Sequence, residues 1–222
     1  MQTEPQDRNA FTGREHLQDF FATDEEKRAP FKHWAADPKL IVLDVLTTDR
    51  WGEVVEIAAV NAKGEVVFHS RIKPCTAVQE GAEKFHGIST ADLMDAPTMD
   101  AVWPRLTDAL RGKNAVMWNA AYDASRIAYS LDMALPGWRD QESSILRSRR
   151  WKDFCFMLRC AGCAMSAYAP IAGKWNQPLN NFMMVGLAAA CTAQGLPAPV
   201  TLPTTISEAH TTLALIRKLG AA

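Results

Sequence analysis

Residues 40–72 carry the clearest pattern of the chain, which is a series of short apolar segments with extended character. Residues 40–46 are apolar almost throughout, and such a run predicts a central strand that is buried on both faces. Residues 53–60 and 65–72 predict two further strands, separated by a turn at 61–64. Because short loops join antiparallel neighbours, the three segments predict an antiparallel meander.

After residue 100 the pattern becomes mainly helical. The predicted helices cover residues 101–111, 123–133, most of 141–169, 180–194 and 205–219, and a short apolar strand is expected at 115–118. Strands first and helices mostly later predict an α/β fold, in which a mixed sheet of about five strands is flanked by helices.

The first 38 residues differ from the rest because they are mostly polar and charged. Residues 12–15, Thr-Gly-Arg-Glu, have the spacing of a capping box and predict a short helix that runs to residue 21. The Asp-Pro pair at 37–38 then interrupts the chain. We therefore predict an N-terminal extension over residues 1–38 and a single domain over residues 39–222.

Composition limits the classes of function that remain. The chain has 222 residues, of which 48% are hydrophobic, and this suits one globular domain. Its net charge of -1 provides no overall basic field, so any binding of nucleic acid must come from local patches or bound metal. No apolar run is long enough to span a bilayer, and the five cysteines come without a signal peptide. We therefore expect reduced thiols, a cytoplasmic location and no membrane contact.

The best indication of function is Asp44, a charge within the apolar run 40–46. Burying a carboxylate is costly unless a cation or a hydrogen-bonding partner compensates it. Further polar motifs follow predicted strands or open predicted helices. In chain order, the motifs are Asp44 with Thr47-Thr48, His86-Gly87-Ile88, Asn119-Ala120-x-x-Asp123 and Ala209-His210.

This order and spacing resembles the DEDDh 3′–5′ exonucleases, a family that includes the proofreading subunit of the bacterial replicative DNA polymerase and ribonuclease T. The resemblance covers about residues 39–219 and implies a ribonuclease H-like fold. It also implies hydrolysis of DNA or RNA from the 3′ end with two Mg²⁺ or Mn²⁺ ions, held by an Asp-x-Glu motif, a second Asp and a His-x-x-x-x-Asp motif. Two hard cations about 4 Å apart suit this reaction because they contact both the attacking and the leaving oxygen.

Carried over to this chain, the resemblance implies that Asp44 and Asp123 bind metal and that His210 is the general base. Both aspartates then count as catalytic residues together with His210. It also assigns substrate binding to Thr47, Thr48, His86 and Asn119.

Two positions depart from the family pattern. Leu46 stands where the family has Glu, and Leu215, five residues after His210, stands where it has the final Asp. Leucine offers no lone pair to a cation, so we expect activity to be weakened or lost. Glu208 lies seven residues before Leu215, about 10 Å along a helix, and we therefore do not expect it to replace that ligand. We expect the two leucines to meet and fill the space of one metal ion.

Several alternatives stay open. Asp44 could accept hydrogen bonds from backbone amides, Asp123 and His210 could be helix caps, and His86 could be structural in a turn with Gly87. At the level of function, the alternative to an exonuclease is a non-catalytic module that binds nucleic-acid ends or a protein. The expected partners are a single-stranded DNA or RNA 3′ end and a polymerase or another protein, and oligomers are compatible with the sequence.

Overall fold

The computed structural model describes residues 23–135, 154, 157–158, 160–197 and 202–222. The predicted capping box at 12–15 with its helix lies outside these residues. Most of the stretch 141–159, for which we predicted helix, lies outside them too.

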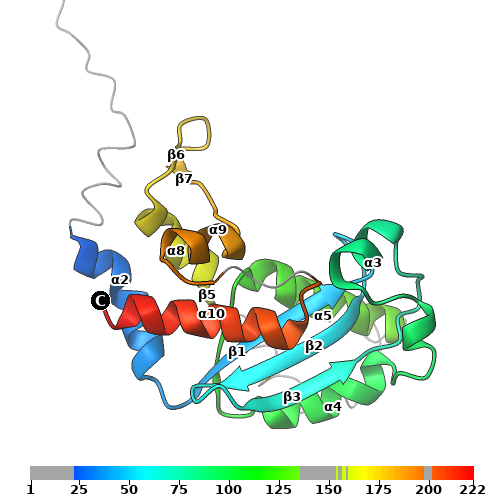
Figure 1. Ribbon diagram of the computed structural model, residues 1–222. Coiled ribbons are helices and arrows are strands. Elements are labelled where there is room, and N and C mark those ends of the chain that lie inside the picture. Colours follow the sequence, from blue (N-terminus) through cyan, green and yellow to red (C-terminus); the bar gives the residue numbers. More distant parts are fainter. Residues whose placement is uncertain (1–22, 136–153, 155–156, 159, 198–201) are drawn as a thin grey trace, which may run out of the picture.

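A mixed five-stranded sheet forms the centre of the fold (Figure 1), as the sequence predicted. The strands are β1 (Leu40–Thr47), β2 (Val54–Asn61), β3 (Val66–Arg71), β4 (Asn114–Met117) and β5 (Gly162–Cys163), in the spatial order β3-β2-β1-β4-β5. The meander β1-β2-β3 is antiparallel, as expected, whereas β4 and β5 add to β1 in parallel. The carboxyl ends of three parallel strands therefore meet at one edge, where ligands bind in open α/β sheets.

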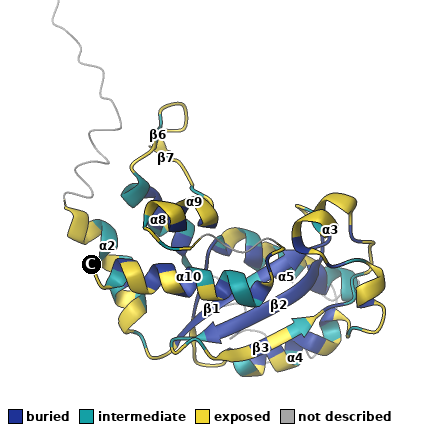
Figure 2. Ribbon diagram, viewed as in Figure 1, coloured by how far each residue is buried: buried dark blue, intermediate teal, exposed yellow. Residues whose placement is uncertain are grey.

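Helices cover both faces of the sheet, and β1 is buried along most of its length (Figure 2). Asp44 is its one half-buried position. Ile41, Leu43 and Val45 belong to the cluster that packs against α4 (Met99–Ala109) and α5 (Ala120–Ala134). Leu40 and Val42 point to the opposite face, which α10 (Thr205–Gly220) covers. Since side chains alternate along a strand, Asp44 and Leu46 share this α10 face.

The helices around α10 differ in part from the prediction. Only Leu187–Ala193 (α9) of the predicted helix 180–194 is helical. Residues Asn181–Phe182 (β7) instead form a two-stranded hairpin with Trp175–Asn176 (β6), in which the Trp175 and Phe182 rings meet edge to face. Helix α8 (Ala164–Ala172) lies beside α9. The prediction was wrong here because the alanine-rich helical pattern, which belongs to residues 187–193, was extended backwards over residues that form a short hairpin.

Residues before position 38 contribute to the core. Helix α2 (Asp24–Ala36) begins with a capping box. In it, the Thr23 hydroxyl accepts a hydrogen bond from the Glu26 N–H, and the Glu26 carboxylate accepts one from the Thr23 N–H. Phe31 of α2 is fully buried among the side chains beneath α10. The two helices cross closely at Gly220, where a Cβ atom would lie 2.8 Å from the Phe31 carbonyl oxygen.

Helix α3 (Glu80–His86) and the short 3-10 helix η1 (Ala91–Leu93) complete the edge of the molecule next to the carboxyl end of β1. Gly87 ends α3 with a φ of 75°, a left-handed conformation that glycine adopts without strain. None of the helices in the described parts of the chain is long and apolar enough to cross a membrane.

Candidate functional site

A cavity of about 420 Å³ opens where β1 ends, and its wall includes residues of α3 and of the first turn of α10. The lining side chains that matter for the chemistry are Asp44, Leu46, Thr47, Phe85, His86 and Glu208. The sequence motifs around positions 44 and 86 therefore meet in space, although 42 residues separate them.

Asp44 is the central acid of this cavity. The residue as a whole is half-buried, but its Oδ2 atom is enclosed and has no hydrogen-bond partner. Burial raises the pKa of Asp44 well above its ordinary value, and the nearby charges of Asp123, Glu208 and Glu56 raise this pKa further. A buried carboxylate oxygen without a donor is costly, so this atom is suited to a ligand that brings positive charge.

Asp123 lies in the first turn of α5 and is almost completely buried. Burial raises its pKa to about 8, against the opposing effect of hydrogen bonds from the backbone of Asn119 and of Asp123 itself. Glu208 also raises the pKa of Asp123 by charge repulsion. Asp123 is not part of the cavity wall, but its charge acts directly on Asp44.

Glu208, which we did not expect to replace the missing acid at position 215, does reach the cavity. It lies in the first turn of α10, is half-buried and lines the cavity with Asp44. Burial raises its pKa. The start of α10 is held in place by Glu56, whose Oε2 accepts hydrogen bonds from the Thr205 backbone N–H (3.0 Å) and hydroxyl (2.9 Å).

The direction of α10 explains why Glu208, and not position 215, reaches the cavity. At the start of the helix, Thr205 donates a hydrogen bond to Glu56, which lies opposite Leu46 near the end of β1. Near the end of the helix, Arg217 donates to the Ala62 carbonyl, just beyond the opposite end of the β1–β2 pair. The helix therefore leads away from the cavity, and only its first turn faces the acids. Positions 208 and 215 share a helix face because seven residues make about two turns.

His210 and Leu215 are not brought to the cavity. His210 is exposed, and its Nε2 donates a hydrogen bond to the Gly64 carbonyl in the β2–β3 turn (2.9 Å). Leu215 is fully buried in the core beneath α10, whereas Leu46 belongs to a separate cluster with Val55 and Val78. The two leucines thus do not fill one common space, contrary to our expectation.

One sequence signal could have located Glu208. The Thr204 hydroxyl accepts a hydrogen bond from the Ser207 N–H, and the Ser207 hydroxyl is within bonding distance of the Thr204 backbone. Thr204-x-x-Ser207 thus caps the helix and places Glu208 in its first turn. An acid there is well placed to act at the same sheet edge as Asp44.

Thr47 and His86 brace the end of β1. The Thr47 hydroxyl lies 2.8 Å from the Tyr122 hydroxyl and 2.7 Å from the Asp49 carbonyl oxygen. The His86 ring donates from Nε2 to the Thr47 carbonyl (3.2 Å) and accepts at Nδ1 from the Ile88 N–H (3.1 Å). Burial lowers the pKa of His86, so the ring is neutral and both nitrogens are occupied.

Thr48 and Asn119 lie outside the cavity wall. The buried Thr48 accepts a hydrogen bond from the Glu53 N–H at its hydroxyl and another from the Gln79 N–H at its carbonyl. Asn119 is the N-cap of α5, and its carbonyl accepts from the Asp123 N–H. Thr48 therefore orders the connection that follows the strand of Asp44, and Asn119 orders the start of the helix that carries Asp123.

The acids suit one divalent cation better than two. Within the described residues, no three Asp, Glu, His or Cys side chains gather closely enough to form a metal site by themselves. The unpartnered Oδ2 of Asp44 and the second acid Asp123 nevertheless fit a hard cation, since Mg²⁺ needs only one or two carboxylates when water and phosphate oxygens complete its shell. Leu46 occupies the strand position from which a third carboxylate would reach the same face.

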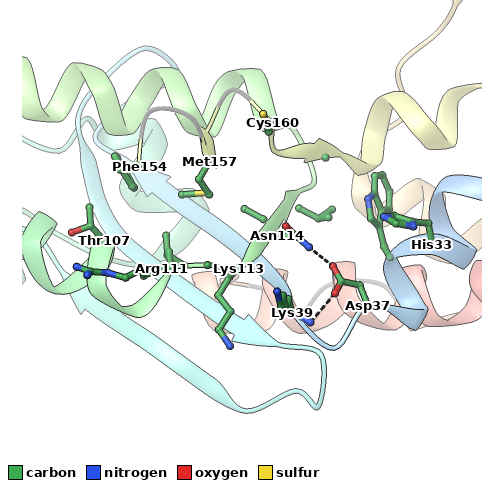
Figure 3. A pocket seen from close by; sticks show the side chains of 16 residues that line it. His33, Asp37, Lys39, Thr107, Arg111, Lys113, Asn114, Phe154, Met157 and Cys160 are labelled. Atoms are coloured by element: carbon green, nitrogen blue, oxygen red, sulfur yellow. Dashed lines mark hydrogen bonds between the residues drawn. The ribbon is translucent and has the colours of Figure 1, made fainter. Parts of the chain in front are cut away.

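A larger hollow of about 900 Å³ lies elsewhere and is lined by residues of α2, of the end of α4 and of β4 (Figure 3). Its acid, Asp37, accepts hydrogen bonds from the Asn114 side chain (2.7 Å) and the Lys39 N–H (2.8 Å). Asp37 is thus already satisfied, and we place the candidate site at Asp44.

Comparisons with known proteins agree with this fold. The model of the Exonuclease family matches residues 42–174. The chain is 26% identical over 146 residues to the uncharacterized exonuclease CP81 of Escherichia phage 186, a match that covers 64% of this chain and 68% of that protein. It is 31% identical over 105 residues to DNA polymerase III subunit epsilon of Escherichia coli (strain K12), covering 42% of this chain and 43% of the subunit. The chain thus spans less than half the length of that subunit.

The solved structure of exonuclease X in complex with 5′ overhanging duplex DNA has the same fold. The two match with a TM-score of 0.52 and 18% sequence identity, over 82% of this chain and 92% of exonuclease X. Because the family model covers more than half of the chain, we conclude that this protein, which has a ribonuclease H-like fold, belongs to the Exonuclease family.

Proposed function

We propose that this protein binds the 3′ end of a single DNA or RNA strand at Asp44 and removes terminal nucleotides slowly, with Mg²⁺ or Mn²⁺. The observation that supports this most directly is the enclosed, unpartnered Oδ2 of Asp44 beside the buried acid Asp123. Burial raises the pKa of both acids, that of Asp123 to about 8, and therefore disfavours their charged forms unless positive charge lies nearby. A divalent cation supplies this charge and would bring the phosphate of the substrate with it.

The cavity offers separate surfaces for a phosphate and for a base. Its volume of about 420 Å³ lies in the lower part of the range of small-molecule sites, as suits a single terminal nucleotide. Asp44 and Glu208 form the acidic side of the cavity, and Asp44 with the buried Asp123 behind it would hold the cation. Phe85, which is 58% exposed, and the apolar Leu46 form a surface against which a terminal base could pack. When bound, the cation would polarise the phosphodiester and lower the pKa of a bound water.

We expect slow hydrolysis for two structural reasons. Leu46 supplies no oxygen ligand, which limits the site to fewer carboxylates than the family pattern has. Among the described residues of the cavity wall, His86 is the only imidazole, and both of its nitrogens are engaged by the backbone. The water that attacks the phosphorus would therefore lose its proton without help from a free histidine.

The test uses a 5′-labelled single strand with Mn²⁺ and gel separation of the products. The wild type should shorten the strand from its 3′ end only with Mn²⁺, and Asp44→Asn should abolish shortening. The control Asp37→Asn changes an acid away from the cavity and should behave as wild type. Failure to bind or shorten the strand would contradict the proposal.

A non-catalytic end-binding module is the second candidate, favoured by the buried Leu46 and the engaged His86. It predicts retention of the intact strand with no shortening at any Mn²⁺ concentration. The likeness to a DNA polymerase III subunit makes a polymerase the protein partner that we propose for either function. Co-elution of the two proteins in size-exclusion chromatography tests this, and the same experiment shows any oligomer.

A further inference from the structure

An alternating row of arginine and aromatic side chains lies next to the cavity. The Arg50 guanidinium carbon is 5.2 Å from the centre of the Trp51 ring, and that of Arg126 is 5.8 Å from the same ring. Arg126 also lies over Tyr129, 5.2 Å from its ring centre. Trp51 is 63% exposed and Tyr129 is 36% exposed. Arg126 thus joins two exposed aromatic rings, whose flat faces are of the kind on which nucleic-acid bases stack.

The row is held in a fixed position by helix α5. Tyr122 contacts the Thr47 hydroxyl, the Arg126 guanidinium donates to the Trp51 carbonyl, and the Ser130 hydroxyl accepts from the Val54 N–H (2.7 Å). The three helix positions are spaced by four residues and therefore lie along one face of α5. They tie the β1–β2 connection to the helix at three successive turns, so the exposed Trp51 ring is presented on a rigid support.

The charges of the row are available to an anionic partner. Within the part of the chain that the structure describes, neither Arg50 nor Arg126 forms an ion pair with a carboxylate. The hydrogen bonds of Arg126 go to neutral groups, the Trp51 carbonyl and the Ser125 hydroxyl (3.2 Å). Arg50 belongs both to this row and to the wall of the cavity. The row therefore continues directly from the acidic site.

We propose that Trp51, Arg126 and Tyr129 form a binding site for single-stranded nucleic acid, which holds the unpaired bases that precede the 3′ nucleotide in the cavity. Flat rings stack on any base, and guanidinium groups pair with the phosphates between them. Paired bases in a duplex hide their faces, so the site selects single strands. This inference rests on the proposed function, since the strand is the one whose end enters the cavity.

The test compares strands that reach the row with strands that do not. Binding of a 5′-fluorescent ten-nucleotide strand and of a fluorescent dinucleotide is measured by anisotropy with Ca²⁺. Trp51→Ala should weaken binding of the long strand by about 5- to 150-fold, because one stacked base contributes about 1–3 kcal/mol. Binding of the dinucleotide should be unchanged. Leu179→Ala, which removes another exposed apolar side chain on the β6–β7 turn, should bind both as wild type does.

Each outcome separates this inference from the proposed function. If wild type and Trp51→Ala bind the long strand equally well while the Asp44-dependent shortening persists, the row is not a binding site and only this inference fails. The inference is also overturned if Trp51→Ala weakens binding of the long strand and of the dinucleotide equally, or if it weakens binding of a blunt duplex as much as binding of the long strand. If the wild type binds neither strand, both proposals fail. Melting temperatures close to that of the wild type show that Trp51→Ala leaves the fold intact.

Discussion

Replacing Leu46 with glutamate should add a carboxylate beside Asp44 and make the protein depend on metal for stability. Leu46 is only 6% exposed and packs with Val55, Val78 and Ile88. Losing this burial costs about 1.5–3 kcal/mol, and a new charge near Asp44 adds repulsion in the metal-free state. At about 2–4 °C per kcal/mol for a chain of this size, the burial alone corresponds to a melting temperature that is lower by roughly 3–12 °C in EDTA.

A divalent cation should reverse much of this loss. Glutamate at position 46 shares a strand face with Asp44, so the two carboxylates and the cation can meet. A cation at 100 times its dissociation constant stabilises the folded state by about 2.7 kcal/mol, which corresponds to roughly 5–11 °C. The same change should increase the Mn²⁺-dependent shortening of a labelled strand.

The assay is thermal unfolding in EDTA and in Mn²⁺, followed by the strand-shortening gel. Leu46→Gln is the matched control because it has the shape of glutamate without the charge. Leu46→Glu combined with Asp44→Asn tests whether both acids are needed. If Leu46→Glu and Leu46→Gln respond equally to Mn²⁺, the carboxylates do not share a cation and the reasoning about this site is refuted.

Three other predictions concern the fold around the site. Leu215→Asp should prevent stable folding, seen as loss of cooperative thermal unfolding, because Leu215 is fully buried beneath α10. In EDTA, the free energy of unfolding by urea should fall by a few kcal/mol from pH 5 to pH 8. The reason is that the pKa of Asp123 is raised to about 8 in the folded state, and a raised carboxyl pKa makes the folded state less stable as pH rises. Asp123→Asn should make the free energy of unfolding less dependent on pH over this range. Gly52→Ala should lower the free energy of unfolding by about 1–3 kcal/mol, measured in urea, since the new Cβ would lie 1.9 Å from the Thr48 hydroxyl oxygen.

Most of the sheet could be predicted from the sequence because its signals are local. The apolar run at β1 and the turn before β3 predict the meander without information from distant parts of the chain. Asp44 could be found for the same reason, since a charge in a buried strand conflicts with its surroundings. Strand β5 and the β6–β7 hairpin were missed, because two-residue strands carry almost no periodic signal.

The third acid could not be assigned from helix periodicity. Glu208 and Leu215 lie on the same face of α10, so the pattern of apolar and polar residues is equally consistent with either. The two residues differ in their position along the helix axis, and which of them reaches the cavity depends on where the helix begins relative to β1. That position is set by the hydrogen bonds between Glu56 and Thr205, which join residues 149 positions apart.

The three contacts along α5 have a mechanical consequence. The helix that supports Trp51 through Arg126 also carries Asp123 in its first turn. If a nucleic-acid strand binds at Trp51 as we propose, a force on that ring acts on the same helix that carries Asp123, one of the acids of the candidate site. Tension along a bound strand would thus reach Asp123 through about one helical turn, since Arg126 and Asp123 are three residues apart.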